Sequence, residues 1–234
     1  MANMDAGRRE NYNGRKFLIE DYKSIYKNIM KTSQVLKNYG VSSSLRDVVT
    51  KTYYDTDNMF FKSKGINISI NTYKNRPHAD LIIRYAADEG ASRIEFLSDI
   101  PDTFIKKINK RDKIYSYYEY IANAVLELLP NGINVDALDA VRTIREKLTV
   151  TKKRDRYRVI SSNGLKIVFS FEQSVYQNVR RNKVKLNILE LRLDSSNSTL
   201  NDFEKFVHHL QIEEFRLIKV PESDLILGQQ YLDI

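Results

Sequence analysis

Residues 53–71 read YYDTDNMFFKSKGINISIN, and this stretch decides the fold prediction because it joins two strands through a capped turn. The first of these strands is predicted over 50–54. Asp55 and Thr56 then suit a structural turn before a short apolar helix, since such side chains accept hydrogen bonds from the first backbone amides of a helix. After Gly65, three isoleucines alternate with polar residues as far as Asn71, which predicts a strand with one apolar and one polar face.

Similar patterns predict further strands on both sides of a helical middle. Alternation of apolar and polar residues predicts strands at 15–19, 80–85, 92–98, 149–160, 165–172 and 183–193. Apolar residues at helical spacing predict one helix after residue 19 that stops at Gly40, and others at 100–109, 115–129, 135–148 and 199–210. Residues 211–234 have no clear period. Strand groups around a helical middle are typical of an α+β protein with a mainly antiparallel sheet.

Length and composition exclude several classes of protein. The 234 residues contain no cysteine and three histidines, which excludes disulfides and a cysteine nucleophile and argues against a histidine-rich metal centre. No apolar run approaches the roughly 18 residues of a membrane span, and the polar N-terminus lacks the core of a signal peptide. We therefore expect a soluble, cytoplasmic protein with a flexible N-terminal arm over 1–11 and a single domain over 12–234.

The net charge is concentrated in one segment. The chain has 38 basic and 30 acidic residues, giving +8. Residues 151–185 hold ten lysines and arginines against Asp155 and Glu172, so ten minus two equals the net charge of the whole chain. Such a segment indicates a phosphate-rich ligand, a nucleic acid, or simply a solvated pair of basic strands.

In several predicted strands one face is polar. One face of 149–160 carries Lys152, Arg154, Arg156 and Arg158. A sandwich with its polar face in water has this pattern, and so does a closed barrel with helices outside and a polar interior. In the barrel, clustered arginines would line a tunnel for an anion, because guanidinium groups match phosphate oxygens. Alternation by itself fits both architectures.

Four short motifs, in order along residues 12–210, resemble those of the CYTH superfamily, the triphosphate tunnel metalloenzymes. They are RKFLI (15–19), the 53–71 stretch, KRDRYR (153–158) and ILELRL (188–193). The resemblance implies an eight-stranded antiparallel β-barrel with helices packed outside, whose tunnel binds a triphosphate. Members hydrolyse inorganic triphosphate, thiamine triphosphate or RNA 5′-triphosphates, and some are adenylate cyclases. Lysines and arginines would hold the phosphates, while glutamates would bind Mg²⁺ or Mn²⁺ where hydrolysis occurs.

The resemblance also suggests a role for individual residues in the tunnel. The expected phosphate-binding residues are Lys16, Arg84, Arg93, Arg154, Arg156, Arg158 and Arg192. The expected metal ligands are Glu95, Glu172 and Glu190, and two of these, Glu95 and Glu190, would be the catalytic residues.

The acidic motifs depart from the family pattern. The opening pair of glutamates corresponds to Tyr12 and Gly14, and the closing Glu-x-Glu becomes Glu190-x-Arg192. An anion site is therefore expected in altered form, while the metal site is expected to be depleted.

Three functions stay open at this point. The first is binding of a triphosphate, polyphosphate or nucleotide with weak or lost hydrolysis, as in a pseudoenzyme. The second is an active triphosphatase that depends on a divalent metal. The third is a nucleic-acid-binding domain, with RNA as a partner, that uses residues 151–185 on its outside. The third requires outward arginines and a steep salt dependence.

Overall fold

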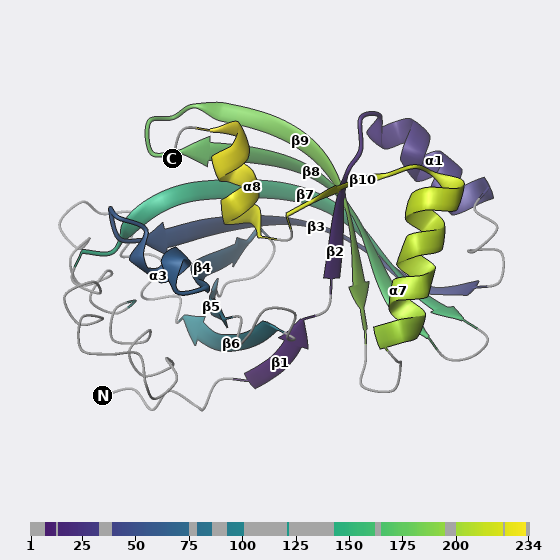
Figure 1. Ribbon diagram of the computed structural model, residues 1–234, viewed down its shortest axis with the longest axis horizontal. Coiled ribbons are helices and arrows are strands. Elements are labelled where there is room, and N and C mark those ends of the chain that lie inside the picture. Colours follow the sequence, from purple (N-terminus) through teal and green to yellow (C-terminus); the bar gives the residue numbers. More distant parts are fainter. Residues whose placement is uncertain are drawn as a thin grey trace.

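The protein is α+β, with an antiparallel sheet and helices beside it (Figure 1). The computed structural model describes residues 8–12, 14–32, 39–74, 79–85, 93–100, 121, 143–161, 165–194, 200–221 and 223–232. Its strands are β1 (Arg8–Tyr12), β2 (Gly14–Leu18), β3 (Tyr39–Asp55), β4 (Ile66–Tyr73), β5 (Ala79–Tyr85), β6 (Arg93–Ile100), β7 (Arg145–Ser161), β8 (Lys166–Asn178), β9 (Lys183–Leu193) and β10 (Ile218–Val220). Its helices are α1 (Tyr22–Thr32), α3 (Phe60–Ser63), α7 (Leu200–His208), the π-helical η2 (His209–Glu214) and α8 (Asp224–Tyr231). The predicted fold class and antiparallel sheet are confirmed. Within the described part, no helix is long and apolar enough to cross a membrane.

The strand predictions hold better than the helix predictions. β9 has the predicted bounds, whereas β7 and β8 extend beyond theirs. The helix predicted to stop at Gly40 is wrong at its end, because Gly40 lies in β3. The helix predicted over 135–148 is also wrong at its end. Ile144 and Leu148 are four residues apart, a spacing that suits one face of a strand as well as a helix, and β7 already begins at Arg145.

Other corrections concern short elements and the middle of the chain. Residue 100 ends β6 instead of beginning a helix. Of the helices predicted between 101 and 142, only buried Ile121 is described, and it is helical; the rest lies outside the described residues. The tail 211–234 contains η2, β10 and α8, which are too short to show a period in the sequence. Strand β1 includes residues 8–11 of the expected arm.

Two strands from opposite halves of the sheet, β1 and β2, are neighbours in the sequence. The hydrogen-bonded order is β1-β6-β5-β4-β3-β7-β8-β9-β2-β10, so β1 and β2 stand far apart in it. In the sequence, however, only Asn13 separates them. The run 8–18 thus pairs with β6 through its first half, where Tyr12 lies opposite Arg93, and with β9 through its second half, where Gly14 lies opposite Arg192.

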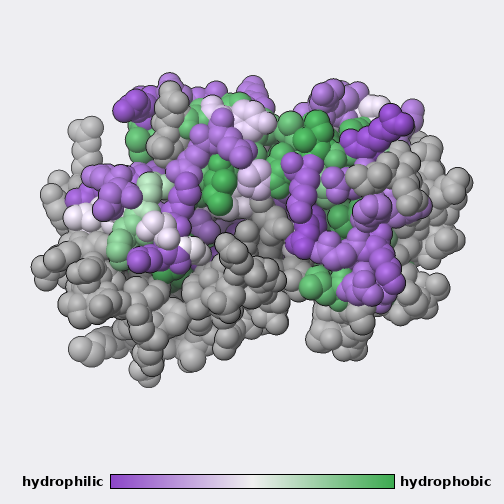
Figure 2. Space-filling model, viewed as in Figure 1, coloured by the Kyte–Doolittle hydropathy of each residue, from purple (hydrophilic) through white to green (hydrophobic). Residues whose placement is uncertain are grey.

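One face of the sheet is apolar and is covered by α1 and α7, which lie together on one side of the molecule (Figure 1). Phe169 of β8 packs edge-on against Phe206 of α7, and Phe171 packs edge-on against Tyr26 of α1. The outward side of α7 is mainly hydrophilic (Figure 2). The expectation of helices packed outside the sheet is confirmed, because burial of this face requires an apolar cover.

The opposite face of the sheet carries buried polar side chains. Directly opposed residues of antiparallel strands project to the same side, so the register assigns these side chains to one face. They include Lys16, Lys51, Ser69, Asn71, Lys152, Ser170, Glu172 and Ser174. At one end of this polar face, Leu225 and Leu227 of α8 pack with Leu148, Val150 and Tyr176 in an apolar cluster.

The turn after β3 has the structural role that the sequence predicts. Asp55 is buried, and its carboxylate accepts hydrogen bonds from the backbone amides of Thr56, Phe61 and Lys62 at 2.7–3.0 Å. The Thr56 hydroxyl accepts another from the amide of Phe60 at 2.9 Å. The first amides of α3 thus have side-chain acceptors, which fixes this helix beside β4.

Candidate anion-binding site

Alternate residues of β7 form a basic row along the polar face. Lys152, Arg154, Arg156 and Arg158 follow one another at every second position, and Glu172 of β8 lies opposite Arg154. Their side chains are 1%, 12%, 25% and 51% exposed in that order. The row therefore leads from solvent at Arg158 to a fully buried ammonium group at Lys152, over about 20 Å of strand.

Three lysines from three strands meet at the buried end of this row. Lys16 of β2, Lys51 of β3 and Lys152 of β7 form what we call the lysine cluster. All three contact the carboxylate of Asp224, the first residue of α8, at 2.6, 3.5 and 2.9 Å. The hydroxyls of Tyr53 and Tyr176 donate hydrogen bonds to the same carboxylate at 3.0 and 3.3 Å.

A second carboxylate stabilises one member of the lysine cluster. The Lys152 ammonium also donates to Glu172 at 2.7 Å, and the Ser170 hydroxyl donates to the other Glu172 oxygen at 3.2 Å. Burial favours the neutral amine, but the charges of Asp224 and Glu172 outweigh it and raise the pKa of Lys152. Burial likewise opposes ionisation of Asp224, yet Lys152, Lys16 and Lys51 hold its pKa well below the usual value.

Lys51 is the weakly stabilised member of the cluster. Burial, followed by the charge of Lys152, lowers its pKa from 10.5 to about 7. Asp224 opposes this shift, but its oxygen is 3.5 Å away, farther than from the other two lysines.

The arginines of the basic row share a carboxylate from β3. Arg154 binds Asp47 through two hydrogen bonds, of 2.9 and 2.8 Å, and Arg156 binds it through one of 2.7 Å. Burial and then the charges of Arg154 and Arg192 lower the pKa of Arg156. Buried polar atoms without a hydrogen-bond partner in the described part are Nε of Arg156, Oδ1 of Asn71 and Oγ of Ser174. Unpaired buried polar atoms of this kind are rare and are satisfied by water or a ligand in functional sites.

The structure brings together several of the residues predicted to bind phosphate. Lys16, Arg154 and Arg156 lie on the polar face and are largely buried. Arg158 lies at the exposed end, where it pairs with Asp194 at 2.6 Å. Nearby, Leu45 of β3 lies opposite Arg156 and is 49% exposed, so this end of the polar face opens to solvent.

The other predicted basic residues surround this group. Arg84 of β5 is close enough for its charge to lower the pKa of Lys51. Arg192 of β9 lies opposite Gly14 of β2. For Arg93 the structure gives the backbone position alone, in β6 opposite Tyr12.

The predicted metal ligands do not form a metal site in the described residues. Glu172 is engaged by Lys152, and Glu190 lies opposite Lys16 in the β2–β9 register. Glu95 is described by its backbone alone, opposite Arg84 in β5. No group of three or more His, Asp or Glu side chains suited to a metal occurs in the part that the structure describes. Among the described carboxylates, Glu172 and Asp224 do not suit Mg²⁺ or Mn²⁺, because a lysine ammonium already lies between them.

Sequence analysis missed four residues of the site. Lys152 begins the alternating basic row and could have been included on that pattern. Asp47 precedes the predicted strand 50–54, and Lys51 lies inside it, but the two faces of that short strand were not assigned. Asp224 follows Ser223, whose hydroxyl accepts a hydrogen bond from the Ile226 amide. A capping serine in the sequence can indicate where a helix begins, but it does not indicate which distant residues the helix contacts.

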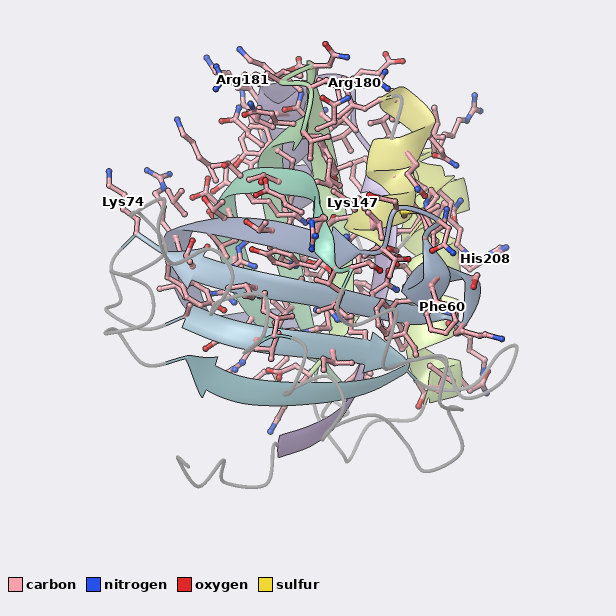
Figure 3. All side chains as sticks on the ribbon, turned by 90° about the vertical axis from the view of Figure 1, so that its left-hand side faces the viewer. Phe60, Lys74, Lys147, Arg180, Arg181 and His208 are labelled. Carbon is pink, nitrogen blue, oxygen red and sulfur yellow. The ribbon has the colours of Figure 1, made fainter. Side chains whose placement is uncertain are left out.

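The basic segment 151–185 divides into two parts. Lys152, Arg154 and Arg156 lie on the polar face of the sheet. Arg180 and Arg181, in the turn between β8 and β9, point away from the sheet at the tip of the hairpin (Figure 3). Arg158 at the end of the basic row is also 51% exposed, so outward arginines of the kind that nucleic-acid binding requires lie both in this turn and at that end of the row.

Comparisons with known proteins identify the fold. No protein-family model and no curated protein matches the sequence. Among solved structures, a candidate adenylate cyclase from Bacillus halodurans has a TM-score of 0.57 at 15% identity, covering 96% of this chain and 98% of that one. A candidate adenylyl cyclase from Hippeastrum, described as having a dominant triphosphatase activity, has a TM-score of 0.54 at 11% identity, covering 94% and 96%. A protein from Pyrococcus horikoshii has a TM-score of 0.50 at 14% identity, covering 94% and 99%. The chain shares the fold of these proteins over nearly its whole described length.

Proposed function

We propose that this protein binds a ligand bearing a triphosphate or polyphosphate along the basic row of β7, with weak or lost hydrolysis. The observation that carries the proposal is the graded burial of Lys152, Arg154, Arg156 and Arg158 on one polar face. A chain of phosphates carries negative charge at regular spacing, and arginine binds phosphate oxygens bidentately. Entry from the exposed Arg158 end would bring the leading phosphate toward the buried lysine cluster.

A closed tunnel of the CYTH type is part of the proposal. The run 8–18 pairs with β6 through one half and with β9 through the other, which supports closure of β1–β9 into an eight-stranded barrel in which 8–18 counts as one strand. The fold shared with the candidate cyclases agrees with this architecture. In such a barrel the polar face would be the interior, shielded from competing water and salt.

Weak hydrolysis follows from the state of the carboxylates. Metal-assisted hydrolysis needs oxygen ligands free to coordinate a hard cation. Here Glu172 and Asp224 both accept hydrogen bonds from Lys152, and Asp224 is also paired with Lys16 and Lys51. We therefore expect the lysines and arginines to bind phosphate without a divalent ion.

Calorimetric titration with tripolyphosphate in the presence of EDTA tests the binding. Arg156→Gln should weaken binding about ten-fold or more, since a hydrogen bond to a charged group contributes roughly 1.5–3 kcal/mol and 1.4 kcal/mol is ten-fold. Arg180→Gln, the same charge change in the exposed turn, is the matched control and should bind like wild type. Equal weakening by both variants would mean that phosphate binds on the outside, as in nucleic-acid binding by 151–185.

Phosphate release from tripolyphosphate, with and without Mg²⁺ or Mn²⁺, tests the active alternative. We include this alternative because a triphosphatase activity is described for the Hippeastrum protein, which has the same fold. We expect no release above background. Metal-dependent release that Arg156→Gln abolishes would instead identify a triphosphatase and would contradict our interpretation of the engaged carboxylates.

A further inference from the structure

The carboxylate of Asp224 has more donors than a carboxylate requires. Three ammonium groups and two tyrosine hydroxyls, from strands β2, β3, β7 and β8, point to its two oxygens within 3.5 Å. The carboxylate is 1% exposed. A phosphoryl group, with three terminal oxygens and up to two charges, would use these donors more fully.

The formal charges of the contacting groups favour an anion at this place. With all three lysines protonated the lysine cluster contributes +3, and the two carboxylates in contact with it, Glu172 and Asp224, contribute −1 each, leaving +1 among these five groups. Without the Asp224 carboxylate, the buried excess would be +2. Removing one partner from a buried ion pair is strongly unfavourable, so the departing carboxylate has to be replaced by another anion.

We infer that Asp224 is an internal ligand that occupies a phosphate subsite formed by Lys16, Lys51 and Lys152, and that a phosphate of the ligand replaces it when α8 withdraws. The inference rests on the proposed function and makes α8 an autoinhibitory element. The ligand would approach along the basic row, and Asp224 would compete with its leading phosphate. Because the open form of the site is a minor state, the observed affinity is reduced by the fraction of molecules that are open.

The attachment of α8 allows such a movement. The helix has eight residues and is joined to the edge strand β10 by residues 221–223. Besides the contacts of Asp224, the contacts that hold it in the described part of the chain are the hydrogen bond from the Ser223 hydroxyl to Asn67 at 3.4 Å, the one from Lys62 of α3 to Gln229, and the packing of the leucines in the apolar cluster. Withdrawal of α8 exchanges these contacts for contacts with the ligand, without altering the pairing of β1–β9.

Gly228 offers a way to fix α8 in place. A Cβ built at Gly228 would lie 2.6 Å from Cδ2 of Leu148 in β7, so side chains at the two positions are in direct contact, and a pair of cysteines there is a candidate for a disulfide. The chain has no cysteine, so the double variant Leu148→Cys/Gly228→Cys would contain a single possible disulfide. Mass spectrometry verifies that it has formed.

The disulfide variant tests whether α8 must move. Oxidised protein should bind tripolyphosphate about ten-fold or more weaker than the same protein after reduction, since the lock removes the open state. The single variant Leu148→Cys controls for the oxidant and should bind equally under both conditions. Equal binding by the oxidised and reduced double variant would overturn the inference.

Asp224→Asn tests the carboxylate itself. This variant should bind tripolyphosphate about ten-fold or more tightly than wild type, because the competing charge is gone. Asp57→Asn, which removes an exposed carboxylate near α3, is the control and should bind like wild type. Loss of the buried charge also destabilises the fold. Thermal unfolding is therefore measured with and without tripolyphosphate. The ligand should raise the Tm of Asp224→Asn more than that of wild type.

The outcomes separate the inference from the proposed function. If wild type and Asp224→Asn bind with equal affinity and Arg156→Gln still weakens binding, the lysine cluster is structural; the inference fails and the proposed function stands. If wild type, reduced double variant and Asp224→Asn all fail to bind tripolyphosphate, the proposed function fails.

Discussion

At the scale of single residues, the three lysines contact the same carboxylate but differ in their surroundings. Lys152 has Glu172 as a second partner at 2.7 Å, whereas Lys51 is 3.5 Å from Asp224 and is repelled by Lys152, Arg84 and Lys16. Two lysines of the same cluster therefore have pKa values shifted in opposite directions: that of Lys152 is raised and that of Lys51 is lowered. A protonated Lys51 adds a donor for an anion, and a neutral one reduces the buried charge.

The stability of the protein should therefore depend on the charge of Lys51. Its pKa is about 7 in the folded protein and 10.5 as the ordinary value, so between these values the unfolded chain binds more protons. The free energy of unfolding consequently rises with pH in this window, by up to about 1.4 kcal/mol per pH unit from this side chain. Urea unfolding at pH 7, 8 and 9 should show a steeper rise for wild type than for Lys51→Met. Parallel curves would show that Lys51 is charged in the folded protein throughout.

At the scale of elements, the turn between β3 and α3 depends on one carboxylate. Asp55 is buried and accepts three backbone hydrogen bonds, so Asp55→Ala should lower the free energy of unfolding by roughly 2–3 kcal/mol through unpaired amides. Asp57, two residues further, has a side chain that is 89% exposed and pairs with Lys147 on the surface. Asp57→Ala should cause a much smaller loss in the same chemical unfolding experiment. Similar losses in the two variants would mean that the cap of α3 contributes little.

At the scale of the whole molecule, the short strand β1 stands at one end of the strand order, beside β6. Its five residues pair with β6, which otherwise would expose its edge to solvent. A chain lacking residues 1–12 should be less stable than one lacking residues 1–7 by roughly 2–5 kcal/mol, since a few backbone hydrogen bonds are lost. It should also associate more readily in size-exclusion chromatography. If the two truncated chains have the same stability and elute alike, β1 does not protect the edge of β6.

Much of the architecture could be predicted from the sequence, because local periodicity reports the faces of strands. The alternation in 183–193 predicts the bounds of β9, and the row from Lys152 to Arg158 predicts one basic face. The α+β class followed from the same patterns, and solved structures that share the fold cover nearly the whole chain. The ends of helices were predicted less well, since a spacing of four residues suits both a helix and a strand face.

The choice of carboxylates that pair with the basic side chains was decided by tertiary structure alone. Asp47 is 107 residues from Arg154, and Asp224 is 72 residues from Lys152 and 208 from Lys16. Periodicity relates a side chain to its neighbours in the same element, but it carries no information on which distant carboxylate a curved sheet brings to a buried lysine. The sequence by itself therefore determined that the protein has a polar, basic face within an antiparallel sheet. Only the folded chain, in which burial makes every unpaired charge costly, decided that α8 supplies the anion at its centre.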